Sequence, residues 1–454
     1  MIKKYDQYKS TASRWLEKIP IHWNELYIQQ VSHERKVKNT GNIEKLVLSL
    51  SYGNIIRKKN IDAGLVAKDL STYQIVEPLN IILRFTDLQN DHKSLRTGLV
   101  RERGIISSAY TCIVPEMNAA YLHYLLHSYD TRKVFYGMGG GVRQSIGFED
   151  IRHMQIPVPP NKEQSQIAHY LDWQLSKINH LIHGYQKQIK LLKERRQTII
   201  DRAATQGINP NVQYKDSGVN WIPQIPEHWN MVYSKKLFAQ RKDKAFPNDI
   251  QLTSSQKYGI ISQDEFMKRE GRRLTVVVTG SDILKHVGIG DFVISMRSFQ
   301  GGLEYSYVEG KISSAYVMLI PNKEKVYDEY FKWLLKSKSY IKALQGTSDL
   351  VRDGQALRYA NFAKVYLPEI PLEEQKAIAD YINSEVTKID NALPTFQKKI
   401  ELLREYCTRL ISDVVTGQID VRDVVIPEYT PEDDTEIDIV DAPDDTEEVA
   451  EDAE

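Results

Sequence analysis

The most regular pattern of apolar and polar positions lies between residues 160 and 206. Apolar side chains recur there in alternating steps of four and three, while Lys, Gln, Glu and Arg occupy most other positions. A 3.5-residue period of this kind predicts a long helix that buries one seam against a second helix. The predicted seam residues are Leu171, Ile178, Ile182, Tyr185, Ile189 and Leu192.

The same pattern returns 211 residues later and predicts a second long helix at 371–417. Because the two seams agree in length and phase, we expect the helices to pack on each other, antiparallel within one chain. A parallel pair, or pairing with another chain, is the alternative. The seam residues of the second helix are Ile382, Ile389, Leu393, Phe396, Ile400 and Leu403.

The sequence before each helix is also repeated. Short motifs recur at an offset of 206 residues near the start and 211 residues near the helix, so one unit has been duplicated with a few loop insertions. The repeated pairs are Tyr8 and Tyr214, Trp15 and Trp221, His22-Trp23 and His228-Trp229, Ser107-Ser108-Ala109-Tyr110 and Ser313-Ser314-Ala315-Tyr316, and Glu163-Gln164 and Glu374-Gln375.

Short β-like runs dominate both repeated parts, which we therefore call the first and second head. The sequence predicts an α+β protein in which two pseudo-twofold-related α/β heads are separated by two long antiparallel coiled-coil helices. The expected segments are a first head at 1–159, a central helix at 160–206, a second head at 207–370, a distal helix at 371–417 and an acidic disordered tail at 427–454.

Composition places the chain among ordinary globular proteins. Of 454 residues, 41% are hydrophobic and 26% are charged. No apolar run reaches the about 18 residues that a membrane span requires, so we expect no membrane association. The two cysteines, Cys112 and Cys407, suit a reducing cytosol, and the expected location is the cytoplasm.

The formal net charge of zero hides a strong asymmetry along the chain. Residues 427–454 contain 14 acidic residues and no Lys or Arg, so the rest carries 60 basic against 46 acidic groups. A basic body favours a polyanionic partner such as nucleic acid. The tail is expected to be disordered and to aid solubility, or, in the alternative, to compete with nucleic acid for the basic surface.

Catalytic motifs are missing from the sequence. It contains no GxxxxGK[ST] phosphate loop, no HExxH and no paired CxxC, so nucleotide hydrolysis and metal catalysis have no support. We therefore predict no catalytic residues and no metal site.

Polar loops that follow matching strands in the two heads are the candidate DNA-binding sites. Arg is suited to guanine, and Gln or Asn to adenine, in the major groove. An ordinary solvated loop, or a phosphate contact that carries no sequence choice, is the alternative for each residue. The candidates are Arg84, Gln89, Asn90, Lys93, Arg96, Arg143 and Gln144 in the first head, and Arg297, Ser298, Gln300, Arg352, Gln355 and Arg358 in the second.

Three repeated motifs resemble the specificity subunits of type I restriction–modification systems. They are the Tyr-Lys…Trp…Ile-Pro-x-His-Trp start, the Ser-Ser-Ala-Tyr strand, and the Glu-Gln-x-x-Ile-Ala helix start. The resemblance covers residue 1 to about residue 420. Two features depart from the family pattern, because the second helix start at 367–371 lacks the Pro-Pro doublet and the family's core has no acidic tail.

The resemblance implies that each head is a target-recognition domain for one half of a bipartite, asymmetric DNA sequence. It also implies that the helices set the spacing and dock two adenine-methylating modification subunits, and that two restriction subunits complete the complex. The chain itself would then be non-catalytic, with S-adenosylmethionine, ATP and Mg²⁺ bound by partner subunits only.

Two other function classes remain as alternatives. A non-catalytic two-headed scaffold that binds protein or RNA would show no sequence-selective binding to duplex DNA. A single-chain methyltransferase or nuclease would require the cofactor or metal motifs that the sequence lacks.

Overall fold

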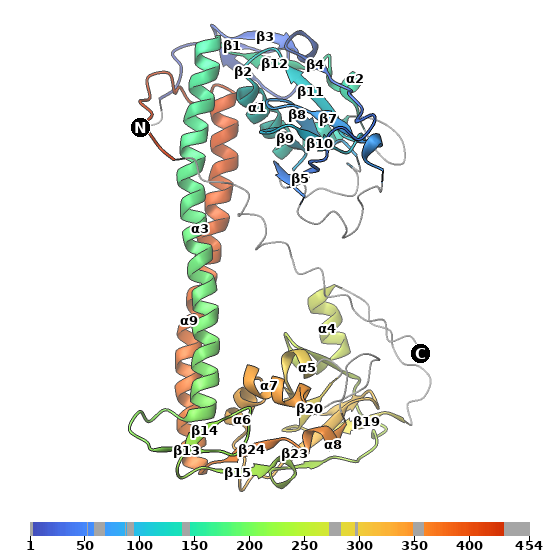
Figure 1. Ribbon diagram of the computed structural model, residues 1–454, viewed down its shortest axis with the longest axis vertical. Coiled ribbons are helices and arrows are strands. Elements are labelled where there is room, and N and C mark those ends of the chain that lie inside the picture. The colour runs from blue at the N-terminus through green and yellow to red at the C-terminus, as the bar shows by residue number, and fades with distance from the viewer. Residues whose placement is uncertain are drawn as a thin grey trace. The chain divides into compact units, whose positions relative to one another are not determined.

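The computed structural model describes residues 3–51, 53–58, 69–86, 88, 95–138, 146–271, 283–295, 298–347 and 358–430 (Figure 1). The chain forms two compact units. Unit 1 consists of residues 1–187 and 396–454, and unit 2 consists of residues 188–395. Each unit therefore contains one head and parts of both long helices. No helix of the described residues is long and apolar enough to cross a membrane.

Within its described residues, unit 1 contains five antiparallel sheets. Its largest sheet has the order β4-β11-β8-β9 (Ser32–Glu34, Thr111–Pro115, Ile81–Leu83, Thr97–Leu99). The two-stranded sheets are β1 (Tyr8–Ser10) with β2 (Lys18–Pro20), β3 (Asn24–Tyr27) with β12 (Gln155–Val158), β5 (Leu48–Ser51) with β6 (Asn54–Arg57), and β7 (Gln74–Val76) with β10 (Gly104–Ile106).

Unit 2 repeats this topology strand for strand. Its four-stranded sheet has the order β16-β23-β20-β21 (Phe238–Gln240, Val317–Pro321, Phe292–Ile294, Glu304–Tyr305). The two-stranded sheets are β13 (Tyr214–Asp216) with β14 (Gln224–Pro226), β15 (Asn230–Tyr233) with β24 (Tyr366–Glu369), β17 (Leu252–Ser255) with β18 (Gly259–Ser262), and β19 (Lys285–Val287) with β22 (Gly310–Ile312).

Short helices cover these sheets, and two long helices follow the heads. The first head contains α1 (Ala119–Thr131), α2 (Phe148–Ile151), η1 (Ile28–Gln30), η2 (Leu70–Thr72) and η3 (Val134–Gly137). The second contains η4 (Ser234–Lys236), α4 (Gln263–Glu270), α5 (Ser298–Gly301), α6 (Asp328–Leu334), α7 (Lys338–Gln345) and α8 (Tyr359–Phe362). The long helices are α3 (Asn161–Gln206) and α9 (Leu372–Val415).

Alternation along the strands explains why each four-stranded sheet has two buried faces. In β20, Phe292 and Ile294 join the large core that includes residues of α3 and α9, whereas Val293 points into a smaller core. That smaller core also contains Leu252 of β17 and Val287 of β19, so the outer hairpins cover the second face. Because successive strand residues point to opposite faces, a continuous apolar run is the expected sequence for such a strand.

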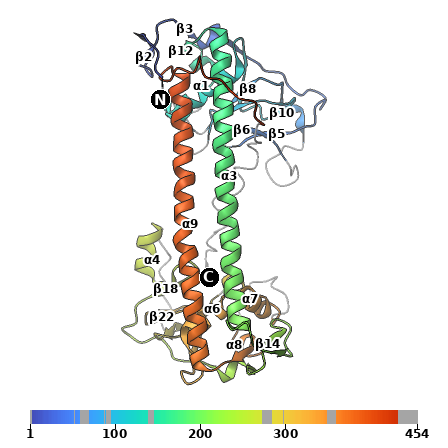
Figure 2. The same cartoon turned by 90° about the vertical axis from the view of Figure 1, so that its left-hand side faces the viewer.

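The long helices run antiparallel within each unit (Figure 2). In unit 1, the ring of Tyr185 in α3 lies 5.7 Å from the ring of Phe396 in α9. Tyr121, in the head that precedes α3, donates a hydrogen bond to the carbonyl of Val415, where α9 ends. In unit 2, Arg196 of α3 pairs with Asp390 of α9 at 2.9 Å. The α+β fold and the antiparallel helices predicted from the sequence are thus confirmed, one unit at a time.

The predicted seam residues line the contact between the two helices. Six of them are buried, namely Leu171, Ile178, Ile182, Ile382, Ile389 and Ile400. The other six are half-buried, namely Tyr185, Ile189, Leu192, Leu393, Phe396 and Leu403. The domain bounds proposed from the sequence stay a prediction, because the compact units divide the chain inside both long helices.

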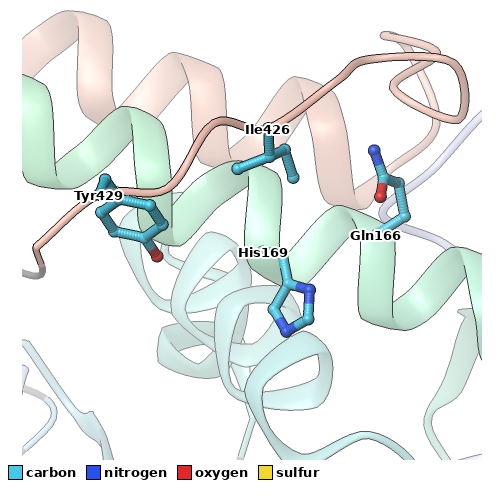
Figure 3. A pocket seen from close by; sticks show the side chains of 4 residues that line it. All are labelled: Gln166, His169, Ile426 and Tyr429. Carbon is cyan, nitrogen blue, oxygen red and sulfur yellow. The ribbon is translucent and has the colours of Figure 1, made fainter.

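A C-terminal segment, residues 417–430, completes unit 1 by packing on the chain's first residues and on α3. Asp420 donates its backbone N–H to the Lys3 carbonyl at 2.9 Å, and the Gln166 side chain donates to the carbonyls of Val421 at 3.0 Å and Val424 at 2.7 Å. Figure 3 shows the segment passing over α3, where Ile426 and Tyr429 line a hollow with Gln166 and His169. The predicted tail at 427–454 therefore begins with four residues of this segment, and 431–454 lie outside the described residues.

We predict that the C-terminal segment stabilises unit 1, whereas the acidic residues after it do not. Truncation after Thr416 removes both hydrogen bonds from Gln166, each contributing about 1 kcal/mol. At roughly 2–4 °C per kcal/mol, the melting temperature of unit 1 should fall by about 4–8 °C, as measured by calorimetry. Truncation after Thr430 is the matched control and should leave the melting temperature unchanged. Equal melting temperatures for both truncations would contradict this prediction.

Candidate nucleic-acid interface

A glutamate at the start of each long helix, buried in unit 1 and half-buried in unit 2, fixes the head to that helix. In unit 1, Oε1 of Glu163 accepts hydrogen bonds from the Trp23 indole at 3.0 Å and the Tyr5 hydroxyl at 2.6 Å, and Oε2 lies 2.8 Å from Nε2 of His22. Burial and then the bond to Glu163 raise the pKa of Tyr5 far above its usual value, so its hydroxyl remains a donor. The repeated His-Trp motif is therefore a structural anchor in this unit.

The same anchor is present in unit 2. Oε1 of Glu374 accepts from the Trp229 indole at 3.1 Å, and Oε2 lies 2.8 Å from Nε2 of His228. Both indoles are fully buried, so each needs the acceptor that the glutamate provides. Two copies of one contact at the offsets found in the sequence show that the repeat preserves packing as well as topology.

The glutamine that follows each glutamate holds the main helix of the head. The Gln164 side chain accepts from the backbone N–H of Asn118, which caps α1, at 3.0 Å. The Gln375 side chain accepts from the backbone N–H of Tyr327, which precedes α6, at 2.8 Å. Each long helix therefore begins with a Glu-Gln pair whose two side chains fix different parts of the same head.

A tyrosine in each head also contacts the end of the other long helix. The Tyr121 hydroxyl donates to the Val415 carbonyl of α9 at 3.2 Å, and the Tyr330 hydroxyl donates to the Ala204 carbonyl of α3 at 2.7 Å. Carbonyls at the end of a helix lack partners inside the helix, so these buried hydroxyls satisfy them. Each head is thus joined to the start of one long helix and to the end of the other.

On this frame, the structure describes five of the thirteen candidate DNA-binding residues. Gln300 and Arg358 are exposed, Arg84 is half-buried, and Arg96 and Ser298 are fully buried. The other eight, Gln89, Asn90, Lys93, Arg143, Gln144, Arg297, Arg352 and Gln355, lie outside the described residues. Contact with DNA stays a prediction for all of them.

Arg96 has no solvent-exposed surface and binds groups at the bases of two loops. Its Nη1 donates to the Thr86 carbonyl at 2.6 Å, and its Nε donates to the Tyr136 hydroxyl at 3.3 Å. Thr86 precedes the candidate loop at 87–94, and Tyr136 lies just before the candidate loop at 139–145. In this conformation the side chain supports the loops and does not face the surface.

A second contact shows that the residues flanking these two loops are neighbours. The Ile146 backbone N–H, just after the second loop, donates to the Phe85 carbonyl, just before the first, at 3.3 Å. The rings of Phe85 and Phe135 lie 5.0 Å apart beneath both. Residues that are about 50 positions apart in sequence are therefore neighbours at the loop bases, as a composite binding surface requires.

In the second head, the first candidate loop is fixed by its own turn and by a contact with the α6–α7 connection. Ser298 is buried because its hydroxyl accepts from the Ser295 N–H at 2.9 Å, so it shapes the turn after β20. Gly302 has φ +82°, and a Cβ there would lie 2.3 Å from the Leu335 carbonyl. Only glycine allows this approach of the loop to the α6–α7 connection.

The two residues that flank the other candidate loop of the second head are also held together. The Asn361 side chain donates to the Thr347 carbonyl at 2.9 Å and accepts from the Arg358 N–H at 3.2 Å. Thr347 and Arg358 flank residues 348–357, so Asn361 closes the base of that loop.

Sequence reasoning missed these supporting residues. Asn361, Gly302 and Tyr136 lie outside the repeated motifs, and their partners are backbone groups or the Arg96 side chain, whose positions only the fold reveals. The Gly301-Gly302 pair before a strand was the one local signal, since paired glycines mark tight backbone approaches. Among the described residues, no group of three or more His, Cys, Asp or Glu side chains could hold a metal ion.

Comparison with known proteins connects this architecture to a family. Residues 101–191, which include the end of the first head and the start of α3, match the model of the type I restriction modification DNA specificity domain. The chain is therefore similar to the specificity subunits of type I restriction–modification systems. The resemblance inferred from the repeated motifs is confirmed.

Two curated relatives come from Methanocaldococcus jannaschii. The protein described as the specificity subunit of the type I restriction enzyme MjaX is 27% identical over 66% of this chain and 68% of its own length. The specificity subunit of the type I restriction enzyme MjaVIII is 25% identical over 71% of this chain and 76% of its own length. Both alignments extend well beyond a single head.

A solved structure has the same fold. It is a chain from a study of complex assembly and conformational transition in a type I restriction–modification system, with a TM-score of 0.64 and 14% identity. The match covers 88% of this chain and 99% of that chain. Specificity subunits are non-catalytic, which agrees with the absence of catalytic motifs in the sequence.

We predict that the glutamate anchor stabilises each unit strongly. Glu163→Ala leaves the Trp23 indole and the Tyr5 hydroxyl without their acceptor, which should cost on the order of 2–4 kcal/mol of unfolding free energy in unit 1. Denaturant unfolding would measure this loss. Glu374→Ala should cost less, because among the described residues Oε1 of Glu374 accepts from the Trp229 indole, without the second donor that Tyr5 provides to Glu163. Glu149→Ala, at a solvent-exposed position, is the control, and a loss as small as that of this control would refute the anchor's role.

Proposed function

We propose that this specificity subunit reads a bipartite, asymmetric DNA sequence, with one half-site bound by each head. The observation that supports this most directly is the pair of heads with one topology and one anchor but different loops. The loop between β8 and β9 spans residues 84–96, whereas the equivalent loop between β20 and β21 spans only residues 295–303. Two heads that share one topology but differ in loop length fit the recognition of two different half-sites.

The chemistry of the loops and of the whole chain supports DNA as the ligand. Candidate residues include arginine and amide side chains, which form bidentate contacts with guanine and adenine. The body of the chain outside residues 427–454 has an excess of 14 positive charges, which favours the phosphate backbone. The phosphate contacts would give affinity, and the loop contacts would give sequence choice.

The catalytic steps of the complex are assigned to partner subunits in this proposal. Two modification subunits would hold S-adenosylmethionine and methylate adenine N6 after rotating the base out of the stack, since the stacked base is not accessible to them. Two restriction subunits would use ATP and Mg²⁺ to cleave unmethylated DNA. This chain would bind none of these cofactors.

We predict that the chain, assembled with its modification subunits, enriches one interrupted sequence from randomised duplex DNA. The two half-sites should differ, because the loops of the two heads differ. Binding selections at two salt concentrations would show overall affinity falling with salt while the preferred sequence stays the same. Salt-sensitive binding without an enriched sequence would overturn the proposal and favour a two-headed scaffold.

The repeat also points to the surface on which the two modification subunits dock. Leu191 and Leu402 occupy equivalent positions of the two helices and are 54% and 52% exposed. Tyr170 and Tyr381 are likewise equivalent; Tyr381 is 43% exposed, and Tyr170 is half-buried beside Tyr406. Unit 1 contains Tyr170 and Leu402, and unit 2 contains the equivalent residues Tyr381 and Leu191, so each unit has the same two residue types at repeated positions of its helices. Two copies of one surface fit two copies of one partner.

We predict that Leu402→Glu and Leu191→Glu each remove one modification subunit from the complex, and that the double variant removes both. A charge in a newly buried apolar contact is costly, which should weaken that copy at least tenfold. Native mass spectrometry would report the stoichiometry. Thr408→Glu is the control, since it lies six positions after Leu402 and therefore on another helix face. Full occupancy in the double variant would exclude this surface.

A further inference from the structure

Arg96 is a fully buried arginine in a head whose proposed task is to bind DNA. Its Nη1 donates to the carbonyls of Thr86 at 2.6 Å and Arg84 at 3.4 Å, and its Nε donates to the Tyr136 hydroxyl at 3.3 Å. Its own backbone N–H donates to Asp130 Oδ2 in α1 at 2.5 Å. The side chain therefore connects the residues that follow β8 with Tyr136 in η3, and the backbone of the same residue is held by α1.

The groups that Arg96 holds are the bases of the two candidate loops. Arg84 and Thr86 precede residues 87–94, Arg96 itself follows them, and Tyr136 precedes residues 139–145. The guanidinium lies 5.5 Å from the centre of the Tyr136 ring, which adds a cation–π contact to the hydrogen bond. A shift of this side chain would move both loop bases together.

The second head contains no arginine at the equivalent position. Leu303 precedes β21 as Arg96 precedes β9, and it is buried and apolar. There, the loop base is fixed by the close approach of Gly302 to the Leu335 carbonyl. The arginine is thus not needed to form the repeated fold, because the same sheet forms in unit 2 without it.

We propose that Arg96 is a positioning residue that sets the geometry in which the two loops of the first head read DNA, without touching DNA itself. The proposal rests on the proposed function above. Arginine suits this task because its planar group directs several donors in fixed directions, whereas lysine offers one ammonium on a flexible stem. Sequence reading depends on loop positions that are held to a fraction of an ångström, so a loosened base should lower discrimination more than affinity.

The test compares the sequence preferences of variants assembled with their modification subunits, by selection from randomised duplex DNA. Arg96→Lys keeps the charge and removes the planar guanidinium with its several N–H donors. We expect the ratio of preferred to other bases to fall roughly tenfold in one half-site only. Tyr136→Phe removes one acceptor and keeps the ring, and it should relax the same half-site by a smaller factor. Gly302→Ala introduces a Cβ against Leu335 in the second head and should relax the other half-site.

Two controls keep the outcome decisive. Arg103→Lys, at an exposed arginine of the first head that pairs with Glu44 and Glu77, should leave both half-sites unchanged. Melting temperatures show whether each variant folds, and Tyr136→Phe decides the question if Arg96→Lys does not fold. Unchanged preference in folded Arg96→Lys, or equal relaxation of both half-sites, would overturn the positioning role. A wild-type selection that yields no sequence would instead overturn the proposed function, and the inference with it.

Discussion

Each unit depends on a carboxylate at the start of a long helix, which is buried in unit 1 and half-buried in unit 2. Glu163 and Glu374 each accept a hydrogen bond from a fully buried tryptophan indole and lie against a histidine. A buried carboxylate and a buried indole are both unfavourable alone, and together they satisfy each other. Because the glutamate belongs to the first turn of the helix, the contact fixes where the helix begins relative to its head. The position of each head on its long helix therefore follows from this contact.

A second constraint is a contact between each head and the last turn of a long helix. Tyr121 and Tyr330 donate to carbonyls of Val415 and Ala204, so each head contacts the last turn of one long helix as well as the first turn of the other. This arrangement requires antiparallel helices inside a unit, because only then do a helix start and a helix end lie beside one head. The unequal loops are free to vary, since neither contact involves them.

Most of the fold could be predicted from the repeated sequence. The recurrence of the Trp and Ser-Ser-Ala-Tyr motifs at an offset of 206 and of the Glu-Gln motif at 211 predicted two equivalent heads. The 3.5-residue period predicted the helices and their seam. Antiparallel packing was the expectation, with a parallel pair as the alternative, because equal phase allows either direction. The C-terminal segment was not foreseen, since its contacts with Gln166 use backbone carbonyls that any sequence possesses.

Loop composition alone could not separate side chains that face DNA from side chains that hold the loops. Arg96 and Ser298 have the residue types of base-reading groups, yet both are fully buried. Arginine offers donors in fixed directions, and these can satisfy backbone carbonyls as well as guanine. The decisive quantity is which acceptors lie within reach, and for Arg96 they are Thr86 and Arg84 carbonyls and a tyrosine hydroxyl. A sequence-specific surface thus needs two sets of similar residues, one exposed to the ligand and one buried beneath it, and only the fold assigns a residue to one of them.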